Sequence, residues 1–168
     1  MGAIPPTAEQ IQNLPAALTA SVTAAHTDGN GHMNVLHYLD HNSRGADALV
    51  RAVGVDESYR QRGAGLFTAE HHLVYYSELR EGDEFSVHPR VLERSSKAIH
   101  MMTFLLDTGR ARLANTLEIM LVHVDLGARR ASPLPGDIAA GLDERLDRSR
   151  ALGWPAPICG AMRIRERE

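Results

Sequence analysis

The stretch HTDGNGHMNVLHYLDHNSRGADALVRAVG (residues 26–54) joins a polar cluster to a long periodic segment. Within residues 33–53, apolar side chains recur at spacings of three, four and seven, which predicts one helix with a single apolar stripe. The apolar positions are Val35, Leu36, Leu39, Ala46, Leu49, Val50 and Val53. Gly54 is a typical helix stop. Such a helix would be about 31 Å long at 1.5 Å per residue, so it is long enough to lie along a sheet.

Alternating apolar and polar side chains predict strands on both sides of this helix. One strand precedes the helix at residues 18–24, and four follow it at 66–77, 84–93, 97–106 and 112–124. The last four are separated by short turns rich in Gly, Ser and Asp, so we expect antiparallel hairpins. Pro89 lacks an N–H group for the ladder, which predicts a bulge or an edge position for its strand.

The order of one strand, one long helix and four strands predicts an α+β fold with one antiparallel sheet of about five strands curled around the helix. We expect one domain over residues 1–168, with its core at about 17–135 and a C-terminal helix and tail at 136–168. Thr7 and Gln10 have the spacing of a capping box, so a short helical turn is expected there. The sheet would have an open edge, which the pairing of two subunits would cover.

Composition excludes several classes of protein. The formal net charge is −3 with both signs interspersed, whereas nucleic-acid binding calls for a basic stripe, so we expect no nucleic acid as partner. The longest apolar run, residues 119–122, is far too short for a membrane span. The chain has one cysteine, Cys159, and its first thirty residues lack the order of a signal peptide. These features predict a cytoplasmic protein.

The polar cluster before the helix contains candidate catalytic groups, namely His26, Asp28, Asn30, His32 and Asn34. The first amides of a helix have no intrahelical acceptor and carry partial positive charge, which suits a carbonyl oxygen that becomes an oxyanion. Asp28 could attack such a carbonyl or activate a water. Asn34 could hold the water or the carbonyl, and His32 could orient Asp28 or transfer a proton. The cluster therefore predicts hydrolysis of an activated acyl compound.

Three other interpretations of these residues stay open. The cluster could be a polar turn in which Asp28 or Asn30 caps the helix. His37 and His41 stand four residues apart and could bind zinc from one helix face, although no further dense set of ligands accompanies them. Cys159 could be a nucleophile, but it lies in a segment rich in Pro and Gly without a nearby base.

The sequence resembles the hotdog-fold thioesterases, the superfamily that includes 4-hydroxybenzoyl-CoA thioesterase and the plant acyl-carrier-protein thioesterases. The residues that match its motif are Asp28, Asn30, Gly31, His32, Met33, Asn34 and Tyr38. Two further segments are similar to the family, YYSELREGD (75–83) and LVHVDLGARRASPLP (121–135). The resemblance covers residues 20–135.

This resemblance implies a hotdog fold and hydrolysis of acyl-CoA or acyl-carrier thioesters without metal or organic cofactor, with CoA entering as part of the substrate. It also implies homodimers or dimers of dimers whose active sites lie between subunits. Asp28 takes the place of the catalytic carboxylate, as base or nucleophile, with Asn34 and His32 as its catalytic partners. Backbone amides at about residues 32–34 would polarise the carbonyl. Gly31, Met33 and Tyr38 are expected to contact substrate.

The turn at Arg94, Ser95, Ser96 and Lys97 corresponds to a region of the family that meets the nucleotide end of CoA. Cations and hydroxyl groups suit phosphate, although the same residues could form an ordinary surface hairpin. Many relatives carry a glutamate deep in the helix. The corresponding places are Ser43 and Arg44 here, so we expect no second catalytic carboxylate on this helix.

The segments NGHMNVLHY, HVDLGARRASPLP and GWPAP most resemble the thioesterases of carnitine breakdown, which are associated with betainyl-CoA. A cationic betaine group favours aromatic or acidic partners. Glu70 is the acidic candidate, and the aromatic candidates are Tyr38, Phe67, Tyr75 and Tyr76. Two alternatives stay open: a hotdog dehydratase or hydratase in which His26 or His32 pairs with Asp28, and an acyl-CoA-binding module without catalysis.

Overall fold

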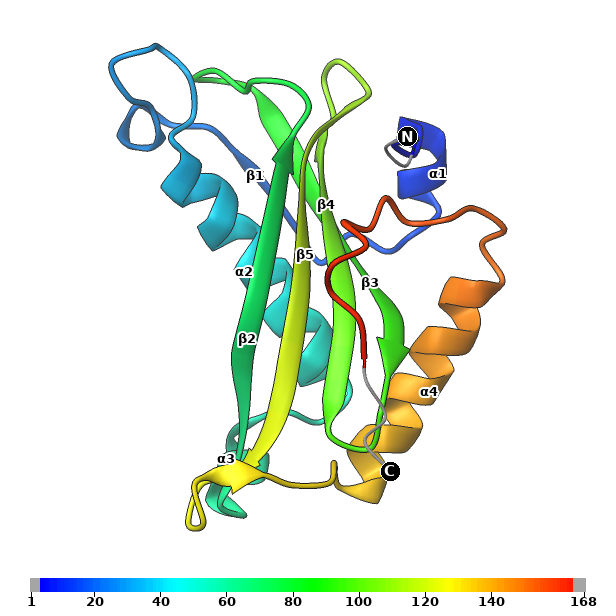
Figure 1. Ribbon diagram of the computed structural model, residues 1–168. Helices are drawn as coiled ribbons and strands as arrows, with labels where there is room; N and C mark the ends of the chain where they lie inside the picture. The colour runs from blue at the N-terminus through cyan, green and yellow to red at the C-terminus, as the bar shows by residue number, and fades with distance from the viewer. Residues whose placement is uncertain (1–3, 165–168) are drawn as a thin grey trace.

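The computed structural model describes residues 4–164 and contains one antiparallel sheet with helices on both faces (Figure 1). The strand order is β1-β3-β4-β5-β2, and β6 pairs with β5. The strands are β1 (Leu18–Ser21), β2 (Ala64–Tyr75), β3 (Glu84–Arg94), β4 (Ala98–Asp107), β5 (Arg112–Asp125) and β6 (Arg130–Ala131). The helices are α1 (Ala8–Gln12), η1 (Ala24–His26, a 3-10 turn), α2 (Val35–Ala52), α3 (Glu57–Gln61) and α4 (Gly136–Arg150). The predicted α+β class is confirmed.

Helix α2 packs along one face of the sheet, which we call the inner face. Its apolar stripe, including Ala46, Leu49 and Val50, joins strand residues such as Met101 and Leu117 in the largest core cluster. Burying one such aliphatic side chain stabilises the fold by roughly 1.5–3 kcal/mol. The predicted central helix and its apolar stripe are therefore confirmed.

Two polar residues interrupt this stripe, and the structure gives each a separate role. Asn42 is fully buried, and its Nδ2 donates to the Tyr38 carbonyl at 2.7 Å and to Asn115 Oδ1 on β5 at 2.6 Å. Its Oδ1 accepts a hydrogen bond from the Thr103 hydroxyl on β4 at 2.7 Å. Ser43 instead lines a cavity between α2 and β2. Asn42 thus fixes the helix to the two central strands.

Two local elements differ from the sequence prediction. The first strand ends at Ser21 rather than near residue 24, because Thr23 begins the 3-10 turn η1 and its N–H donates to His26 Nδ1 at 3.1 Å. The helix α3 was not predicted, because five residues are too few to show helical periodicity. Asp56 is its N-cap, with a side chain that accepts from the Tyr59 N–H.

The sheet has two edges that bear on function. At one edge β1 pairs with residues 84–87 of β3 only, so Pro89 lies beyond the paired part, and the strand bulges between Val91 and Glu93. This confirms the prediction for Pro89. At the other edge lies β2, where every residue from Phe67 to His72 is exposed. The open edge predicted from the sequence is therefore β2.

The opposite, outer face of the sheet is covered by the two ends of the chain (Figure 1). Helix α1 places Ile11 against Met102 and Phe104, and its predicted capping box between Thr7 and Gln10 is formed. Helix α4, predicted at the C-terminal end, runs beside β3 and leads into a segment that crosses the outer face. Within residues 4–164, no helix combines the length and the hydropathy needed to cross a membrane.

Candidate active site at the start of α2

A tight loop precedes α2 at one end of the sheet. Thr27 and Met33 form an isolated antiparallel bridge across it, and the Asp28 N–H donates to the His32 carbonyl at 3.1 Å. The Gly31 N–H donates to the Asp28 carbonyl at 3.0 Å, and Gly31 adopts a φ of +79°, which glycine tolerates best. The loop is therefore a closed turn that holds Asp28 next to the start of the helix.

Both carboxylate oxygens of Asp28 accept a hydrogen bond from within this loop. The Asn30 N–H donates to Oδ1 at 2.9 Å, and the Asn34 Nδ2 donates to Oδ2 at 3.3 Å. Each oxygen can accept a further bond. Asp28 is half-buried, so its carboxylate is oriented by the loop and still accessible.

The residue that caps α2 is Asn34, whose Oδ1 accepts from the Leu36 N–H at 3.0 Å. This corrects the hypothesis that Asp28 or Asn30 takes the cap position. The reason is that Asp28 Oδ1 is occupied by the Asn30 N–H two residues later, and that turn places both residues before the helix begins. Asn34 therefore caps the helix through its Oδ1 and donates to the Asp28 carboxylate through its Nδ2.

The backbone amides at the helix start are only partly available to a ligand. The Met33 N–H donates to the Leu79 carbonyl at 2.7 Å, and the Asn34 N–H donates to the His26 carbonyl at 2.8 Å. These bonds correct the expectation that all amides from 32 to 34 polarise a carbonyl. Among the residues from 4 to 164, neither the His32 N–H nor the Val35 N–H has an acceptor. Val35 is the first residue of α2, where the helix dipole favours negative charge.

Neither histidine of the cluster forms a pair with Asp28 in the described part of the chain. His26 Nδ1 accepts from Thr23, and its ring lies 4.7 Å from that of His37. His32 is half-buried, and only its backbone carbonyl bonds to Asp28. The histidine–carboxylate pair expected of a hotdog dehydratase is therefore not formed within this chain.

Met33 and Tyr38, which the resemblance places at the substrate, are 2% and 4% exposed. The Tyr38 hydroxyl accepts from the Leu79 N–H at 2.9 Å, its ring lies 5.3 Å from that of Tyr75, and burial raises the pKa of its phenol. The Tyr38 hydroxyl and the Met33 N–H thus both bond Leu79, which joins the loop to the segment between β2 and β3. Direct contact of either residue with substrate stays a prediction, as it does for the exposed Gly31.

The predicted CoA-binding turn lies at the far end of the sheet from Asp28 in the same chain. Glu84, at the start of β3, pairs with Ser21 near the loop, and Arg94 is ten residues further along, a span of about 33 Å in a strand. Arg94 forms an ion pair with Asp143 of α4, with Nε 2.6 Å from Oδ1. Two further polar side chains of the turn, those of Ser96 and Lys97, are exposed.

Ser95 is also used inside the turn, where its hydroxyl accepts from the N–H groups of Lys97 and Ala98 at 3.2 and 3.0 Å. Within a single chain, Arg94 and Ser95 therefore make the contacts of an ordinary surface hairpin. A role for this turn at the nucleotide of CoA stays a prediction, and it depends on Ser96 and Lys97.

The acidic candidate Glu70 lies on the outer face. It stands opposite Met120 on β5, whereas its neighbour His71 stands opposite Ile119 of the inner core. A bulge between Thr68 and Glu70 shifts the pairing register of β2 and so determines which of its side chains point to the outer face. Within one chain Glu70 is therefore separated by the sheet from α2 and the loop that carries Asp28.

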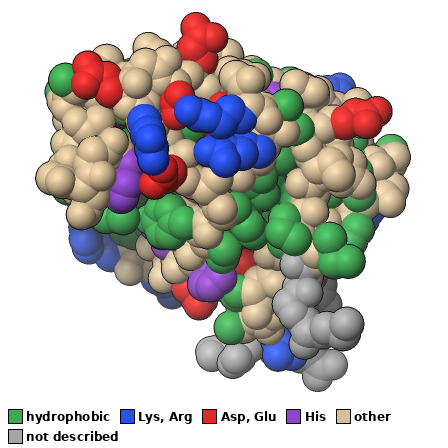
Figure 2. Space-filling model, turned by 90° about the horizontal axis from the view of Figure 1, so that it is seen from above, with side chains coloured by type: hydrophobic (Ala, Val, Ile, Leu, Met, Phe, Trp, Pro, Cys, Tyr) green, Lys and Arg blue, Asp and Glu red, His purple; other side chains and the backbone are tan. Residues whose placement is uncertain are grey.

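The end of the molecule that carries the loop has a charged surface (Figure 2). Basic side chains gather there beside acidic and apolar ones. Arg110 bridges Asp83 and Asp107, with N–O distances of 2.6 and 2.9 Å, and Arg112 also reaches Asp107 at 3.3 Å. The hydrogen bond from Arg110 holds the pKa of the Asp83 carboxyl below its usual range.

Two cavities lie away from Asp28. One of about 190 Å³ lies between α2, α3 and the β2 edge and is lined by Ser43, Tyr59 and His71 among others. A larger one of about 650 Å³ lies between α2, β3 and α4, with Leu49, Val91 and Arg148 in its lining. Neither is lined by the loop of residues 26–34.

The structure tests the two other chemical hypotheses. His41 is buried, and its ring packs against those of His26 and Phe85. Within residues 4–164, potential ligand atoms of three His, Cys, Asp or Glu residues converge only at His72, Glu118 and Cys159. In the described chain, neither His37 nor His41 belongs to such a group of three.

The sequence context of Cys159 indicated that no base lies near it. In the structure Cys159 lies beside a histidine and a glutamate, His72 and Glu118. No sequence signal indicated this cluster, because the irregular segment that carries Cys159 docks on residues far earlier in the chain.

Comparison with known sequences and structures identifies the group to which the fold and the loop belong. A profile of the thioesterase-like superfamily matches residues 22–142. A betainyl-CoA thioesterase of Pseudomonas aeruginosa is 33% identical over 132 residues, which cover 78% of this chain and 83% of that protein. An L-carnitine dehydrogenase/betainyl-CoA thioesterase of Rhizobium meliloti is 33% identical over 121 residues, 72% of this chain. The match spans 24% of the Rhizobium protein, about a quarter of its length.

Solved structures give the same answer for the fold. A Staphylococcus aureus protein in complex with CoA superposes with a TM-score of 0.80 at 25% identity, over 90% of this chain and 97% of that one. A thioesterase-like protein of Pseudomonas putida has a TM-score of 0.73 at 25% identity, over 92% and 98% of the two chains. The predicted hotdog fold is confirmed, and the chain belongs to the thioesterase-like superfamily.

Proposed function

We propose that this chain hydrolyses acyl-CoA thioesters and that the carboxylate of Asp28 carries the reaction. The observation that supports this most directly is the geometry at the start of α2. Asn30 and Asn34 hold the two carboxylate oxygens, and the Val35 N–H beside them has no acceptor in residues 4–164. A carboxylate and a free helix-end donor are the two groups that acyl transfer to water requires.

In this proposal the thioester carbonyl oxygen accepts hydrogen bonds from the Val35 N–H and the His32 N–H. Asp28 acts as a base that takes a proton from water, or as a nucleophile that forms an acyl-enzyme anhydride. In both cases a C–O bond forms, the C–S bond breaks, and CoA leaves as a thiolate that takes up a proton. In the nucleophile route water then attacks the anhydride, and the bond to the Asp28 oxygen breaks, which releases the acid and restores the carboxylate. The donors from Asn30 and Asn34 keep both carboxylate oxygens in place, and each oxygen can still accept one further bond from water or meet the substrate. No metal or organic cofactor takes part in these steps.

We also propose that two copies pair through β2. An edge strand offers a row of unpaired N–H and C=O groups, and β2 offers twelve residues with six consecutive exposed ones. Tyr38 of α2 contacts Tyr75 at the end of β2, so the active-site loop lies close to this edge. Antiparallel pairing about a twofold axis would extend the sheet across both subunits.

This pairing would bring the turn at 94–97 of one subunit close to Asp28 of the other. In an antiparallel pair of β2 strands, the loop end of one subunit lies beside the turn end of the other. Ser96 and Lys97, both exposed, would then meet the phosphates of CoA bound at the neighbouring Asp28. The CoA-bound structure from Staphylococcus aureus supports CoA as part of the substrate. Reducing cytoplasm is the expected place of action, since Cys159 is a free thiol.

Relatives named betainyl-CoA thioesterases support a betaine-type acyl group. A quaternary ammonium group binds over aromatic faces. Tyr75 is 47% exposed and lies at the loop end of β2 on the inner side, with its ring edge-to-face with that of Tyr38. We propose Tyr75 as the aromatic partner of the cation. Phe67 and Glu70 lie on the outer face, so the same chain does not bring them to this position.

The test is a CoA-release assay with betainyl-CoA, short-chain, aromatic and long-chain acyl-CoAs, run beside hydration of an enoyl-CoA. The proposal expects CoA release with at least one acyl-CoA and no hydration. Preference for betainyl-CoA over a neutral acyl-CoA of the same size should fall at least about tenfold in Tyr75→Leu, if the ring supplies about 1.4 kcal/mol of cation–π binding. Hydration without CoA release would overturn the assignment as a thioesterase.

A further inference from the structure

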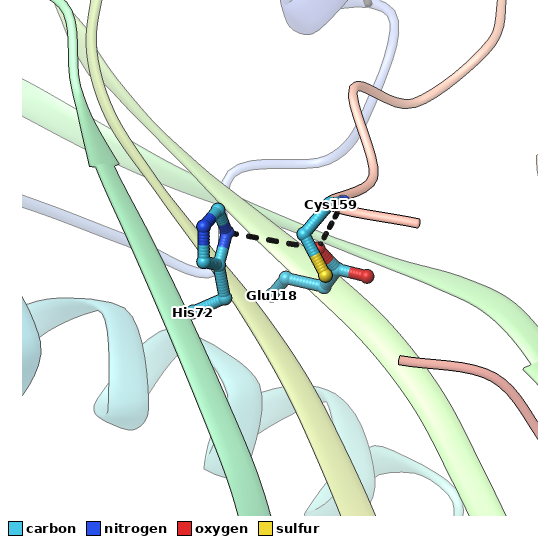
Figure 3. Close-up of side chains that lie close together, drawn as sticks. All are labelled: His72, Glu118 and Cys159. Carbon is cyan, nitrogen blue, oxygen red and sulfur yellow. Dashed lines mark hydrogen bonds and ion pairs between the residues drawn. The ribbon is translucent and has the colours of Figure 1, made fainter. Parts of the chain in front are cut away.

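We propose that His72, Glu118 and Cys159 form a binding site for a zinc-type divalent ion on the outer face of the sheet, and that this ion fastens the C-terminal segment to the sheet (Figure 3). The segment, residues 155–164, crosses the outer face over β4 and β5. The site lies on the face opposite α2, so it is separate from the proposed thioester site.

Three different elements bring the ligand atoms together. His72 on β2 stands directly opposite Glu118 on β5, and Cys159 reaches them from the C-terminal segment. The possible ligand atoms all lie within 4.8 Å of one another, and His72 Nδ1 is 3.9 Å from Glu118 Oε2. Ligand atoms around tetrahedral zinc lie roughly 3.3–3.7 Å apart, given bonds of about 2.0–2.3 Å. A small rotation of the exposed His72 side chain, together with a shift of Cys159, which lies outside regular secondary structure, would bring the three into that range.

Glu118 provides a buried negative charge that needs a cation. Its side chain is 1% exposed, and the ion partners that residues 4–164 offer it are two histidines, His72 and His100. Its oxygens accept hydrogen bonds from His100 Nε2 at 2.8 Å and from the Cys159 N–H at 2.7 Å, so the carboxylate is held in place from two sides. Burial of an ionised carboxylate is costly unless a cation compensates it.

The donor set selects the type of ion. Thiolate and imidazole ligands favour zinc over magnesium and calcium, which prefer oxygen ligands. Three protein ligands leave the fourth position of a tetrahedral site to water. His100 bonds the carboxylate oxygen Oε1, which is the type of supporting contact that orients a metal-binding carboxylate.

Contacts before and after Cys159 give its side chain a defined position. The Met162 N–H lies 3.4 Å from Cys159 Sγ, as a donor to the sulfur. Upstream, Trp154 packs edge-on against Phe104 at 5.5 Å and lies under the guanidinium of Arg90. The segment is thus anchored by Trp154 before the site and by Met162, which is buried, after it. An ion between these anchors would join the segment to β2 and β5.

The direct test is titration of the chelator-treated, reduced chain with Co²⁺ and with Zn²⁺. One Co²⁺ should bind per chain and produce a thiolate-to-cobalt charge-transfer band in the near ultraviolet. Zn²⁺ should displace the cobalt and protect segment 155–164 from hydrogen exchange. Cys159→Ser should abolish the band, and His72→Ala should weaken binding at least about tenfold, as loss of one ligand requires. Both residues are partly or fully exposed, so these variants should fold.

The matched control is His71→Gln, the neighbouring histidine on the inner face of β2. This variant should bind cobalt with the affinity of the original chain and give the same band. Absence of stoichiometric binding to the reduced chain would overturn the proposal. So would binding that Cys159→Ser and His72→Ala leave unchanged. Because the readouts are spectra, affinity and hydrogen exchange, the result is independent of thioesterase activity.

Discussion

Asn34 is hydrogen-bonded to Asp28 through Nδ2, which lies 3.3 Å from Oδ2, while its own Oδ1 caps α2 through the Leu36 N–H. One side chain therefore sets the start of the central helix and the orientation of the proposed catalytic carboxylate. Because the amide has separate donor and acceptor atoms, the two roles can be separated by substitution.

Asn34→Ala should lose both roles, whereas Asn34→Ser keeps an oxygen that can cap the helix and loses the longer Nδ2 donor that reaches Asp28. Serine is a good N-cap, whereas alanine at this position costs about 0.5–2 kcal/mol. We expect Asn34→Ala to lower the free energy of unfolding by about 1 kcal/mol and Asn34→Ser to leave it nearly unchanged. Turnover should fall by a similar factor in both variants. Urea unfolding and CoA release measure the two effects. Full turnover in Asn34→Ser would contradict the orienting role of the amide.

Asn42 links α2 to β4 and β5, and its removal should leave buried polar atoms without partners. In Asn42→Ala, Asn115 Oδ1 loses its donor, and the Thr103 hydroxyl keeps only the long contact with the Leu117 carbonyl at 3.5 Å. Each unsatisfied buried group costs about 1–3 kcal/mol. We expect a loss of at least about 2 kcal/mol in chemical unfolding. In the background of Thr103→Val the same substitution should cost less, and equal costs in both backgrounds would contradict the coupling.

Gly45 allows α2 to approach β3 closely. A Cβ at this position would lie 2.4 Å from Val87 Cγ1, and Val87 is fully buried. Gly45→Ala should therefore lower the free energy of unfolding by about 1–3 kcal/mol despite the better helix propensity of alanine. Val87→Ala in the same chain should recover part of that loss. Gly136→Ala is the control, because no atom lies within 4 Å of its added Cβ.

The stability of the fold should fall as the pH drops below about 6.5, the pKa of an unfolded histidine. Burial lowers the pKa of His41 and of His88, and for His41 this effect exceeds the opposite influence of Asp40. Below that pH the unfolded chain therefore binds protons that the folded chain does not, and each group costs up to about 1.4 kcal/mol per pH unit. Both ring nitrogens of His41 lack a partner in the described structure. His41→Gln should reduce the slope measured by unfolding at pH 7 and pH 5, and an unchanged slope would contradict this assignment.

The sequence predicted elements whose signal is periodic and local. The apolar stripe predicted a helix at 33–53, and α2 spans Val35–Ala52. The alternating segments after residue 65 correspond to β2, β3, β4 and β5 within a few residues. Helix α3 was missed because five residues give no period.

The arrangement of the candidate site depended on contacts between distant residues. The motif indicated Asp28 and Asn34, but the Met33 N–H is withdrawn from the site by its bond to the Leu79 carbonyl, a contact that the local sequence does not encode. The placement of Glu70 depends on a bulge in β2 that was not foreseen. The contact of Cys159 with Glu118 was missed for a similar reason, since it depends on how an irregular segment docks on a strand.

The most direct test of the central claim is the turnover of Asp28→Asn in the CoA-release assay, measured beside its unfolding curve. Asparagine keeps the oxygen that accepts from the Asn30 N–H and loses only the acceptor of the long bond from Asn34 Nδ2 at 3.3 Å, so the loop and the fold should persist. It removes the negative charge that a base or a nucleophile needs. We predict unfolding close to that of the original chain and a loss of turnover of at least about a hundredfold. Turnover equal to that of the original chain would contradict the assignment of Asp28.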